Sequence, residues 1–202
     1  MCNLYRMTKA QAEVAALFSA GSNTQLNAAE EIYPGYPGMV VAEGEVRAMV
    51  WGFPLVLKSK KTGEPLKPKP VNNTRTDKLD SYMWRFSFAE RRCLIPLTAW
   101  AEAEGPKGKM TRTWLSLPEV DLFAVAGIWR ESEEWGDCYS MVMTDAAGRA
   151  AEVHNRMPVI LQGDAVETWQ TGTQEQARAL CRGFTGSTNV DRTEEFWSRR
   201  SA

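Results

Sequence analysis

Apolar residues near the start of the chain recur at the spacing of an amphipathic helix. Thr8 is followed three residues later by Gln11, which is the pattern of a capping box at a helix N-terminus. We therefore expect a helix over residues 8–19, with Gly21 marking its end. Weaker patterns of the same kind predict helices over residues 81–92, 165–168 and 173–182.

The middle of the chain consists of shorter apolar segments separated by turn residues, a pattern typical of strands. Glu43-Gly44 is a candidate hairpin turn, and residues 58–70 are expected to form a loop because they are rich in lysine and proline. The expected strands cover residues 39–42, 45–53, 93–97, 114–117, 122–129 and 139–144. Because strands dominate, we expect an α+β fold, a single domain over residues 1–202. Its core would be a twisted, barrel-like, mainly antiparallel sheet flanked by helices, with residues 162–202 forming terminal helices on the sheet.

The composition is that of an ordinary globular protein, with 44% hydrophobic and 24% charged residues. A net charge of −1 argues against a protein that coats duplex DNA by bulk charge. No apolar run approaches the ~20 residues of a membrane span, and no secretory signal is evident, so we expect a cytoplasmic chain. The four cysteines are not clustered and there is one histidine, so we expect neither a metal site nor a cofactor.

Cys2 becomes the N-terminal residue if Met1 is removed, and a small second residue favours that removal. The product is a 1,2-aminothiol, with an ordinary pKa of about 7.7–8.0 for the amine and about 8.5 for the thiol. The amine can form a Schiff base with an aldehyde, and the adjacent thiol can then close a five-membered thiazolidine ring. On position alone, however, an incidental cysteine at a frayed terminus is the favoured interpretation.

Three further polar residues are candidates for chemistry, and each has a structural alternative. Glu102 follows an apolar strand, where burial would raise its pKa and suit it to proton transfer, but taken alone it is more simply a surface acid. His154 is either a site residue on a loop or a hydrogen-bonded structural histidine. Asn73 offers both donor and acceptor groups and Arg75 offers a fork that matches a phosphate, but taken alone this segment is more simply an Asx turn with an Arg75–Asp77 ion pair.

Seven short motifs nevertheless occur together in one order. They are Met1-Cys2, the turn at Tyr33 to Gly38, Trp51-Gly52-Phe53, Asn73-Thr74-Arg75, Arg91 to Pro96, Trp100-Ala101-Glu102 and His154 to Pro158. In this order the chain resembles the SOS-response-associated peptidase (SRAP) family, also called abasic-site processing proteins. The resemblance runs from Met1 to about Leu161, and the ordered set is specific although each motif is weak by itself.

The resemblance implies an enzyme of the DNA damage response that forms covalent crosslinks with abasic sites, with AP lyase and autopeptidase activities in addition. Cys2, freed of Met1 by autocatalysis, would form a thiazolidine with the ring-opened deoxyribose. Asn73 would orient the Cys2 amine and the adduct. Glu102 would be the general acid/base near the sugar, and His154 would be a second proton shuttle.

The resemblance also implies single-stranded DNA containing abasic sites as the partner, and we expect the protein to be a monomer. The expected DNA contacts are Arg75, Arg156, Arg6, Arg85, Trp51 and Trp84, with Arg91, Arg92, Lys58, Lys60 and Lys61 as further phosphate contacts. The alternative for the lysine run is a solvated loop, and this is the favoured interpretation of Lys67 and Lys69. Arg6 is a stand-in, because the start Met-Cys-Asn-Leu-Tyr-Arg departs from the Met-Cys-Gly-Arg of the family. The two tryptophans are candidates because base–aromatic stacking contributes ~1–3 kcal/mol per base.

Two functions of other classes compete with this interpretation. A cysteine and a histidine permit a conventional cysteine peptidase that acts on other proteins. A non-catalytic module that binds single-stranded DNA is the second alternative. A nucleophile at the extreme N-terminus suits amine chemistry better than a conventional cysteine peptidase.

Overall fold

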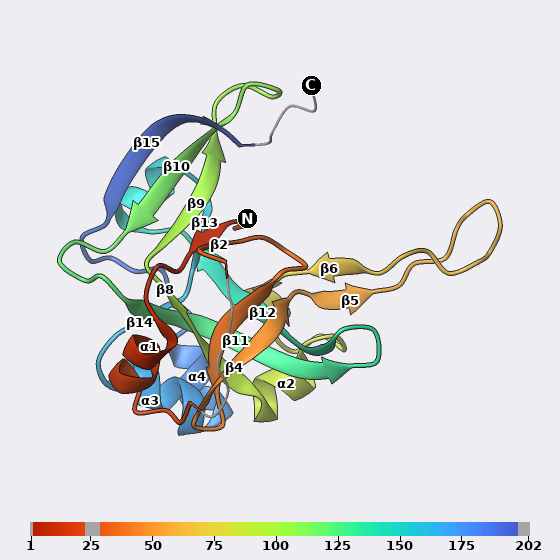
Figure 1. Ribbon diagram of the computed structural model, residues 1–202, viewed down its shortest axis with the longest axis horizontal. Coiled ribbons are helices and arrows are strands. Elements are labelled where there is room, and N and C mark those ends of the chain that lie inside the picture. Colours follow the sequence, from red (N-terminus) through yellow and green to blue (C-terminus); the bar gives the residue numbers. More distant parts are fainter. Residues whose placement is uncertain (1, 23–28, 198–202) are drawn as a thin grey trace.

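Five strands close into a barrel at the centre of the molecule (Figure 1). The structure is a computed structural model, and it describes residues 2–22 and 29–197. In order around the barrel the strands are β12 (Gly136–Asp145), β4 (Glu45–Trp51), β3 (Pro37–Ala42), β8 (Arg92–Leu97) and β11 (Phe123–Ser132), and β11 pairs again with β12. All of these pairs are antiparallel except β12–β4, so the expected α+β fold with a barrel-like, mainly antiparallel core is confirmed.

Apolar runs rather than strict alternation mark the barrel strands. Five of the six residues of β3 and five of the six of β8 are buried, because one face points into the barrel and the other is covered. The turn between β3 and β4 is Glu43-Gly44, as expected, with both residues at positive φ (52° and 75°). This is the backbone that a tight two-residue hairpin turn requires.

Three short strands extend the barrel sheet along β12 and β11. Two of them flank the C-terminal half of β12: β7 (Asn73–Arg75) runs parallel to it and β13 (Arg156–Pro158) antiparallel. The third, β14 (Ile160–Leu161), pairs with β11. Met143 of β12 is the register partner of both Arg75 and Pro158, so β7 and β13 lie on opposite edges of one strand.

A second sheet of five strands carries the start of the chain. Its order is β15 (Asn189–Phe196), β10 (Thr111–Ser116), β9 (Ala99–Glu104), β1 (Tyr5–Arg6) and β2 (Glu31–Ile32). Strand β15 corrects the expectation that residues 162–202 form helices only. Its polar, mostly exposed sequence lacks the apolar alternation of a strand. The strand forms because this segment pairs with β10.

The four α-helices of the described residues gather at the end of the barrel away from the second sheet (Figure 1). They are α1 (Gln11–Leu17), α2 (Arg85–Glu90), α3 (Asp164–Thr171) and α4 (Gln174–Ala179), and two 3-10 turns are η1 (Thr76–Lys78) and η2 (Gly148–Glu152). Trp169 of α3 is fully buried and donates through Nε1 to the carbonyls of Cys93 and Gly127. No helix in the described part of the chain has the length and apolar character to cross a bilayer.

Helices α1, α2 and α4 are shorter than the sequence pattern predicts, whereas α3 extends beyond the predicted residues 165–168. α1 begins at Gln11 rather than Thr8, because the Glu13 carboxylate accepts a hydrogen bond from the backbone N–H of Ala10 (2.8 Å), so the expected capping box at Thr8 is wrong. The helix expected over residues 81–92 is reduced to Arg85–Glu90.

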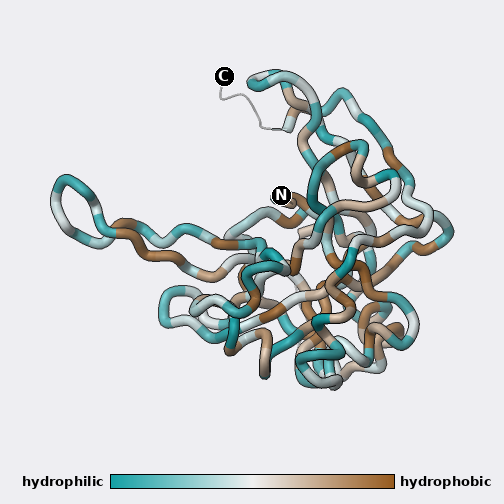
Figure 2. The backbone as a smooth tube through the Cα atoms, turned by 180° about the vertical axis from the view of Figure 1, so that it is seen from behind, coloured by the Kyte–Doolittle hydropathy of each residue, from teal (hydrophilic) through white to brown (hydrophobic). Residues whose placement is uncertain are grey.

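The strand expected over residues 45–53 is broken at Gly52, whose φ is +121°. After Gly52 the chain leaves the barrel as a long hairpin, with β5 (Phe53–Leu55) paired to β6 (Lys69–Val71) (Figure 1). We call residues 53–71 the lysine arm. The loop expected over residues 58–70 forms the outer part of this arm, which projects from the body in both views (Figures 1 and 2).

Candidate functional site

Cys2 lies where the second sheet meets the barrel. Strand β1 pairs with β9 through Tyr5–Trp100 and Arg6–Ala99, and the Ala101 N–H continues this register to the Leu4 carbonyl (2.9 Å). Extending the register brings residues 2–3 alongside Glu102. The Cys2 side chain is fully buried, and its thiol is 3.4 Å from the Leu4 carbonyl.

Two asparagine side chains hold the main chain of Cys2 from the barrel side. The Nδ2 groups of Asn72 and Asn73 donate to the Cys2 carbonyl oxygen at 2.9 Å and 2.7 Å. Both asparagines are buried, and Asn72 also donates to the Asn3 side chain at 3.1 Å. Two donors on one carbonyl restrict the rotation of the Cys2 peptide far more than one would.

Sequence reasoning singled out Asn73 but missed Asn72. The Asn72 carbonyl accepts hydrogen bonds from Trp51 Nε1 and from the Met141 N–H, both at 2.9 Å, and these bonds lock its backbone between β6 and β7. The signal in the sequence was the Asn72-Asn73 doublet between two strands, because adjacent buried amides require partners.

Glu102 is a buried carboxyl in the middle of β9, only 2% exposed. Burial raises its pKa to about 7, because the charged form loses its hydration. Burial of the Cys2 side chain likewise raises the pKa of its thiol, and the negative charge of Glu102 raises that pKa further. The two groups therefore interact electrostatically, and Glu102 has a pKa suited to giving or taking a proton near neutral pH.

His154 lies between η2 and β13 and is half-buried. The backbone N–H of Arg156 lies 3.0 Å from its Nδ1, and the Arg156 carbonyl oxygen lies 3.3 Å from the same nitrogen. Burial lowers the pKa of His154, which keeps the ring neutral around pH 7. Its part in proton transfer remains a prediction.

The expected phosphate contacts Arg75 and Arg156 flank the same strand, β12, and both have carboxylate partners. Arg75 makes a two-point ion pair with Asp77, at 2.8 Å and 2.7 Å, and the bond to Arg75 lowers the pKa of Asp77. Arg156 pairs with Asp145 at 3.0 Å. The Arg75–Asp77 ion pair of the simpler interpretation is therefore present in the fold, and a phosphate would have to replace these carboxylates.

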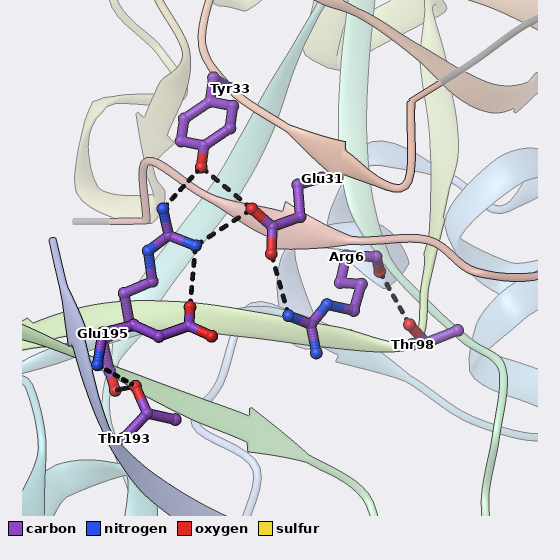
Figure 3. Close-up of polar contacts among 7 residues, drawn as sticks. Arg6, Glu31, Tyr33, Thr98, Thr193 and Glu195 are labelled. Atoms are coloured by element: carbon purple, nitrogen blue, oxygen red, sulfur yellow. Dashed lines mark hydrogen bonds and ion pairs between the residues drawn. The ribbon is translucent and has the colours of Figure 1, made fainter. Parts of the chain in front are cut away.

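Arg6 is also engaged, in a polar network on the second sheet (Figure 3). Its guanidinium donates to Glu31 at 2.9 Å and lies over the Trp114 ring, 3.9 Å from the ring centroid. Arg112 joins the opposite oxygen of Glu31 at 3.1 Å and donates to the Tyr33 hydroxyl at 3.0 Å. These contacts bind β1, β2 and β10 together across the sheet.

Two tryptophans expected to stack on bases are buried. Trp51 is fully buried, with the Tyr5 ring against its edge at 5.0 Å and the Tyr139 ring stacked at 6.5 Å. Trp84 is 6% exposed and packs against Phe53 at 4.9 Å. The expectation of base stacking is wrong for both rings, because tertiary packing uses them as core.

Among the remaining basic candidates, Arg92 is a structural residue. It donates to the carbonyls of Phe88, Ala89, Trp169 and Gly172, which caps the C-terminal ends of α2 and α3. A phosphate role for it is therefore wrong. Arg85 is exposed beside the rings of Tyr82 and Phe86, and its contact with DNA remains a prediction.

Solved structures share this fold across nearly the whole chain. A protein from Bacteroides thetaiotaomicron has a TM-score of 0.76 at 17% identity, with 95% of this chain and 91% of that chain covered. A protein from Bordetella bronchiseptica has a TM-score of 0.76 at 21% identity (95% and 99% covered), and a phage-related protein from the same organism has 0.66 at 18% (96% and 94%). No curated protein matches this chain in sequence.

The family comparison is more specific than these structural likenesses, which show the fold alone. The family model described as "SOS response associated peptidase (SRAP)" matches residues 1–193. That match includes Cys2, Asn73, Glu102 and His154. The chain therefore belongs to the SOS response associated peptidase (SRAP) family.

Proposed function

We propose that this protein captures abasic sites in single-stranded DNA by forming a thiazolidine through Cys2 after Met1 has been removed. Membership of a family named for the SOS response and for peptidase activity supports a role in DNA damage and a self-processing step. In this proposal the peptidase activity is directed at the Met1–Cys2 bond of the chain itself.

The observation that carries the proposal is the convergence of three residues from distant parts of the chain. The Cys2 carbonyl lies 2.7 Å from Asn73 Nδ2, and the charge of Glu102 acts on the Cys2 thiol. A conventional peptidase needs a cysteine paired with a base, and nothing requires it to be the second residue. An aldehyde-capturing aminothiol needs that position, together with a proton donor and acceptor beside it.

The chemistry assigns one task to each group. The Cys2 amine attacks the aldehyde of the ring-opened sugar, and water leaves as the imine forms. Glu102, with a pKa of about 7, protonates the departing oxygen and takes a proton back from the nitrogen, which leaves a neutral imine. The Cys2 thiol then adds to the imine carbon, its proton passes to the nitrogen, and the five-membered ring closes.

The proposal also sets a requirement on access. Cys2 is fully buried in the chain that still carries Met1. Removal of Met1 must therefore give the sugar a path to the amine and thiol.

The test is a denaturing gel of the processed protein mixed with single-stranded DNA that carries one abasic site. We expect a covalent band that is absent for intact DNA and for Cys2→Ala. Cys2→Ser should form only a Schiff base that borohydride traps, because a hydroxyl closes the ring poorly. Cys181→Ala is the matched control, since it removes a different thiol and should leave the band unchanged.

Three outcomes would contradict the proposal. A heat-stable adduct in Cys2→Ser would exclude the thiazolidine. A covalent band from protein whose intact mass retains Met1 would exclude the free amine as nucleophile. Cleavage of unrelated peptides without any DNA adduct would favour a conventional peptidase instead.

A further inference from the structure

The positive charge of the molecule is concentrated on the lysine arm. Residues 53–71 contain five lysines and one glutamate, a charge of +4. The rest of the chain has 19 basic and 24 acidic residues, a charge of −5. The net charge near zero is therefore the sum of a basic lysine arm and an acidic remainder of the chain.

The five lysines of the arm are free to meet a ligand. All of them, Lys58, Lys60, Lys61, Lys67 and Lys69, are exposed. None of the salt bridges found among the described residues involves an arm lysine. Within residues 2–22 and 29–197, no acidic side chain therefore pairs with an arm lysine to neutralise its charge.

The arm is a built hairpin rather than an irregular loop. Beyond β5 and β6, the Leu66 N–H donates to Leu57 (2.7 Å) and the Ser59 N–H donates to Glu64 (2.8 Å). The turn at the tip is held by the Ser59 hydroxyl, which accepts the N–H groups of Lys61 and Thr62. The lysines are therefore presented on a defined scaffold, which lowers the entropy cost of binding.

The base of the arm is anchored beside the candidate site. Phe53 is buried against Trp84, and the Arg130 guanidinium lies over the Phe53 ring and donates to the Pro54 carbonyl. On the other side, Val71 ends β6 and leads directly into Asn72 and Asn73, the two residues that hold Cys2. The anchored end of the lysine arm is therefore followed directly in the chain by the two asparagines of the candidate site.

We propose that the lysine arm binds the phosphate backbone of the DNA strand that flanks the abasic site. This inference rests on the proposed function for its location, since it places the lesion at Cys2 and the flanking strand along the arm. From Leu55 to the tip the arm spans about 20 Å at ~3.3 Å per residue. That length corresponds to about six nucleotides at ~3.4 Å each along one strand. Lysines bind phosphates as point charges without reading bases, so the contact is independent of sequence.

The test measures binding without crosslinking. In a Cys2→Ala background, the affinity for an intact single-stranded oligonucleotide is measured by fluorescence anisotropy at several salt concentrations. Lys60→Gln with Lys61→Gln should lower the slope of log affinity against log salt by about 1.4, because each single-strand phosphate contact contributes ~0.7. Replacing all five arm lysines by glutamine should weaken binding at low salt by at least about tenfold.

Two controls separate the arm from bulk charge. Lys107→Gln with Lys109→Gln removes the same charge from another exposed hairpin loop, between β9 and β10, and should leave the slope unchanged. Replacing the five arm lysines by arginine keeps the charge and should keep the slope. An equal loss in the β9–β10 loop variant, or no loss in the arm variants, overturns the proposal; the latter result would point to an acidic protein as the arm's partner.

The crosslinking assay is read separately. In protein that retains Cys2, the arm variants should reach the wild-type yield of adduct at saturating abasic DNA and fall behind only at low DNA concentration. Because the binding assay uses intact DNA and no Cys2, the arm proposal can fail while crosslinking succeeds. The two assays would equally reveal the opposite case, in which crosslinking fails while the arm still binds DNA.

Discussion

Glu102 combines deep burial with a charge that changes near neutral pH. Its pKa rises from 4.5 to about 7 on folding, so between these values the folded state holds a proton that the unfolded state releases. Stability contributed by this proton is therefore present below pH 4.5 and is lost as the pH rises toward 7. The same property that suits Glu102 to proton transfer thus opposes folding at neutral pH.

We predict that Glu102→Gln removes this pH dependence. Between pH 5 and pH 8 the free energy of unfolding of the wild type should fall, relative to the variant, by about 2.5 kcal/mol. Urea unfolding at the two pH values measures the difference. Glu104→Gln, on the same strand but less buried, is the control, and a parallel decline in wild type and Glu102→Gln would refute the assignment.

Asn72 and Asn73 share one acceptor, so their contributions should be separable. Asn72→Ala removes the 2.9 Å bond to the Cys2 carbonyl and leaves that of Asn73 in place. Loss of one such bond, at about 1 kcal/mol, predicts a roughly fivefold slower crosslinking rate with unchanged DNA affinity.

In the double variant of Asn72 and Asn73, the crosslinking rate should fall by more than the two single changes together predict, because each amide compensates for loss of the other. Single-turnover crosslinking at saturating DNA provides the rates. Asn189→Ala, an exposed asparagine on β15, serves as control. Unchanged rates in Asn72→Ala would show that Asn73 alone holds Cys2.

At the scale of elements, Gly52 is the joint between the barrel and the lysine arm. Its φ of +121° is accessible to glycine but strained for other residues. A Cβ at this position would lie 2.4 Å from the Pro70 side chain. Gly44, in the β3–β4 turn, also has positive φ (+75°), but a Cβ there would meet nothing within 4 Å. Alanine substitutions at the two glycines can therefore be compared to separate the cost of backbone strain from the cost of a steric clash.

We predict that Gly44→Ala costs about 1 kcal/mol of stability, the strain of the left-handed backbone alone. Gly52→Ala should cost at least about 3 kcal/mol, because β5 and β6 must also move apart. It should slow crosslinking too, since Pro70 lies two residues before Asn72. Thermal unfolding of both variants measures the difference, and equal costs would contradict the clash.

Across the whole molecule, the candidate site exists only where the two sheets meet. Glu102 comes from the second sheet, the two asparagines come from the barrel side, and the first strand of the chain brings Cys2 between them. The other three thiols have unrelated positions: Cys93 and Cys138 are buried in the barrel, and Cys181 is half-buried with its pKa raised to about 11 by burial. None of these three should compete with the Cys2 aminothiol once removal of Met1 has made it accessible.

We predict that removal of Met1 adds one rapidly reacting thiol to the folded protein. A thiol reagent at pH 7.5 should label the processed chain about once, and Cys2→Ala should lack that label. A chain kept unprocessed by an N-terminal extension should react slowly at every cysteine. Mass spectrometry locates the label, and fast labelling of Cys93 or Cys138 would contradict the described burial.

Several features of the fold and the site were predictable from local sequence. The β3–β4 turn at Glu43-Gly44, the barrel strands and the loop of the lysine arm follow from turn chemistry, apolar runs and prolines, which act over a few residues. The ordered motifs identified the family and with it Cys2, Asn73, Glu102 and His154 as candidates.

The tertiary structure decided what depends on contacts between distant residues. The same apolar rings that suggested base stacking became core at Trp51 and Trp84, and Arg92 became a cap on two helices. The polar segment Asn189–Phe196 became a strand only because β10 offers an edge. Hydrogen bonding to a remote backbone and loss of hydration on burial are properties of the assembled fold, so the role of Asn72 and the raised pKa of Glu102 could not be derived from the order of residues alone.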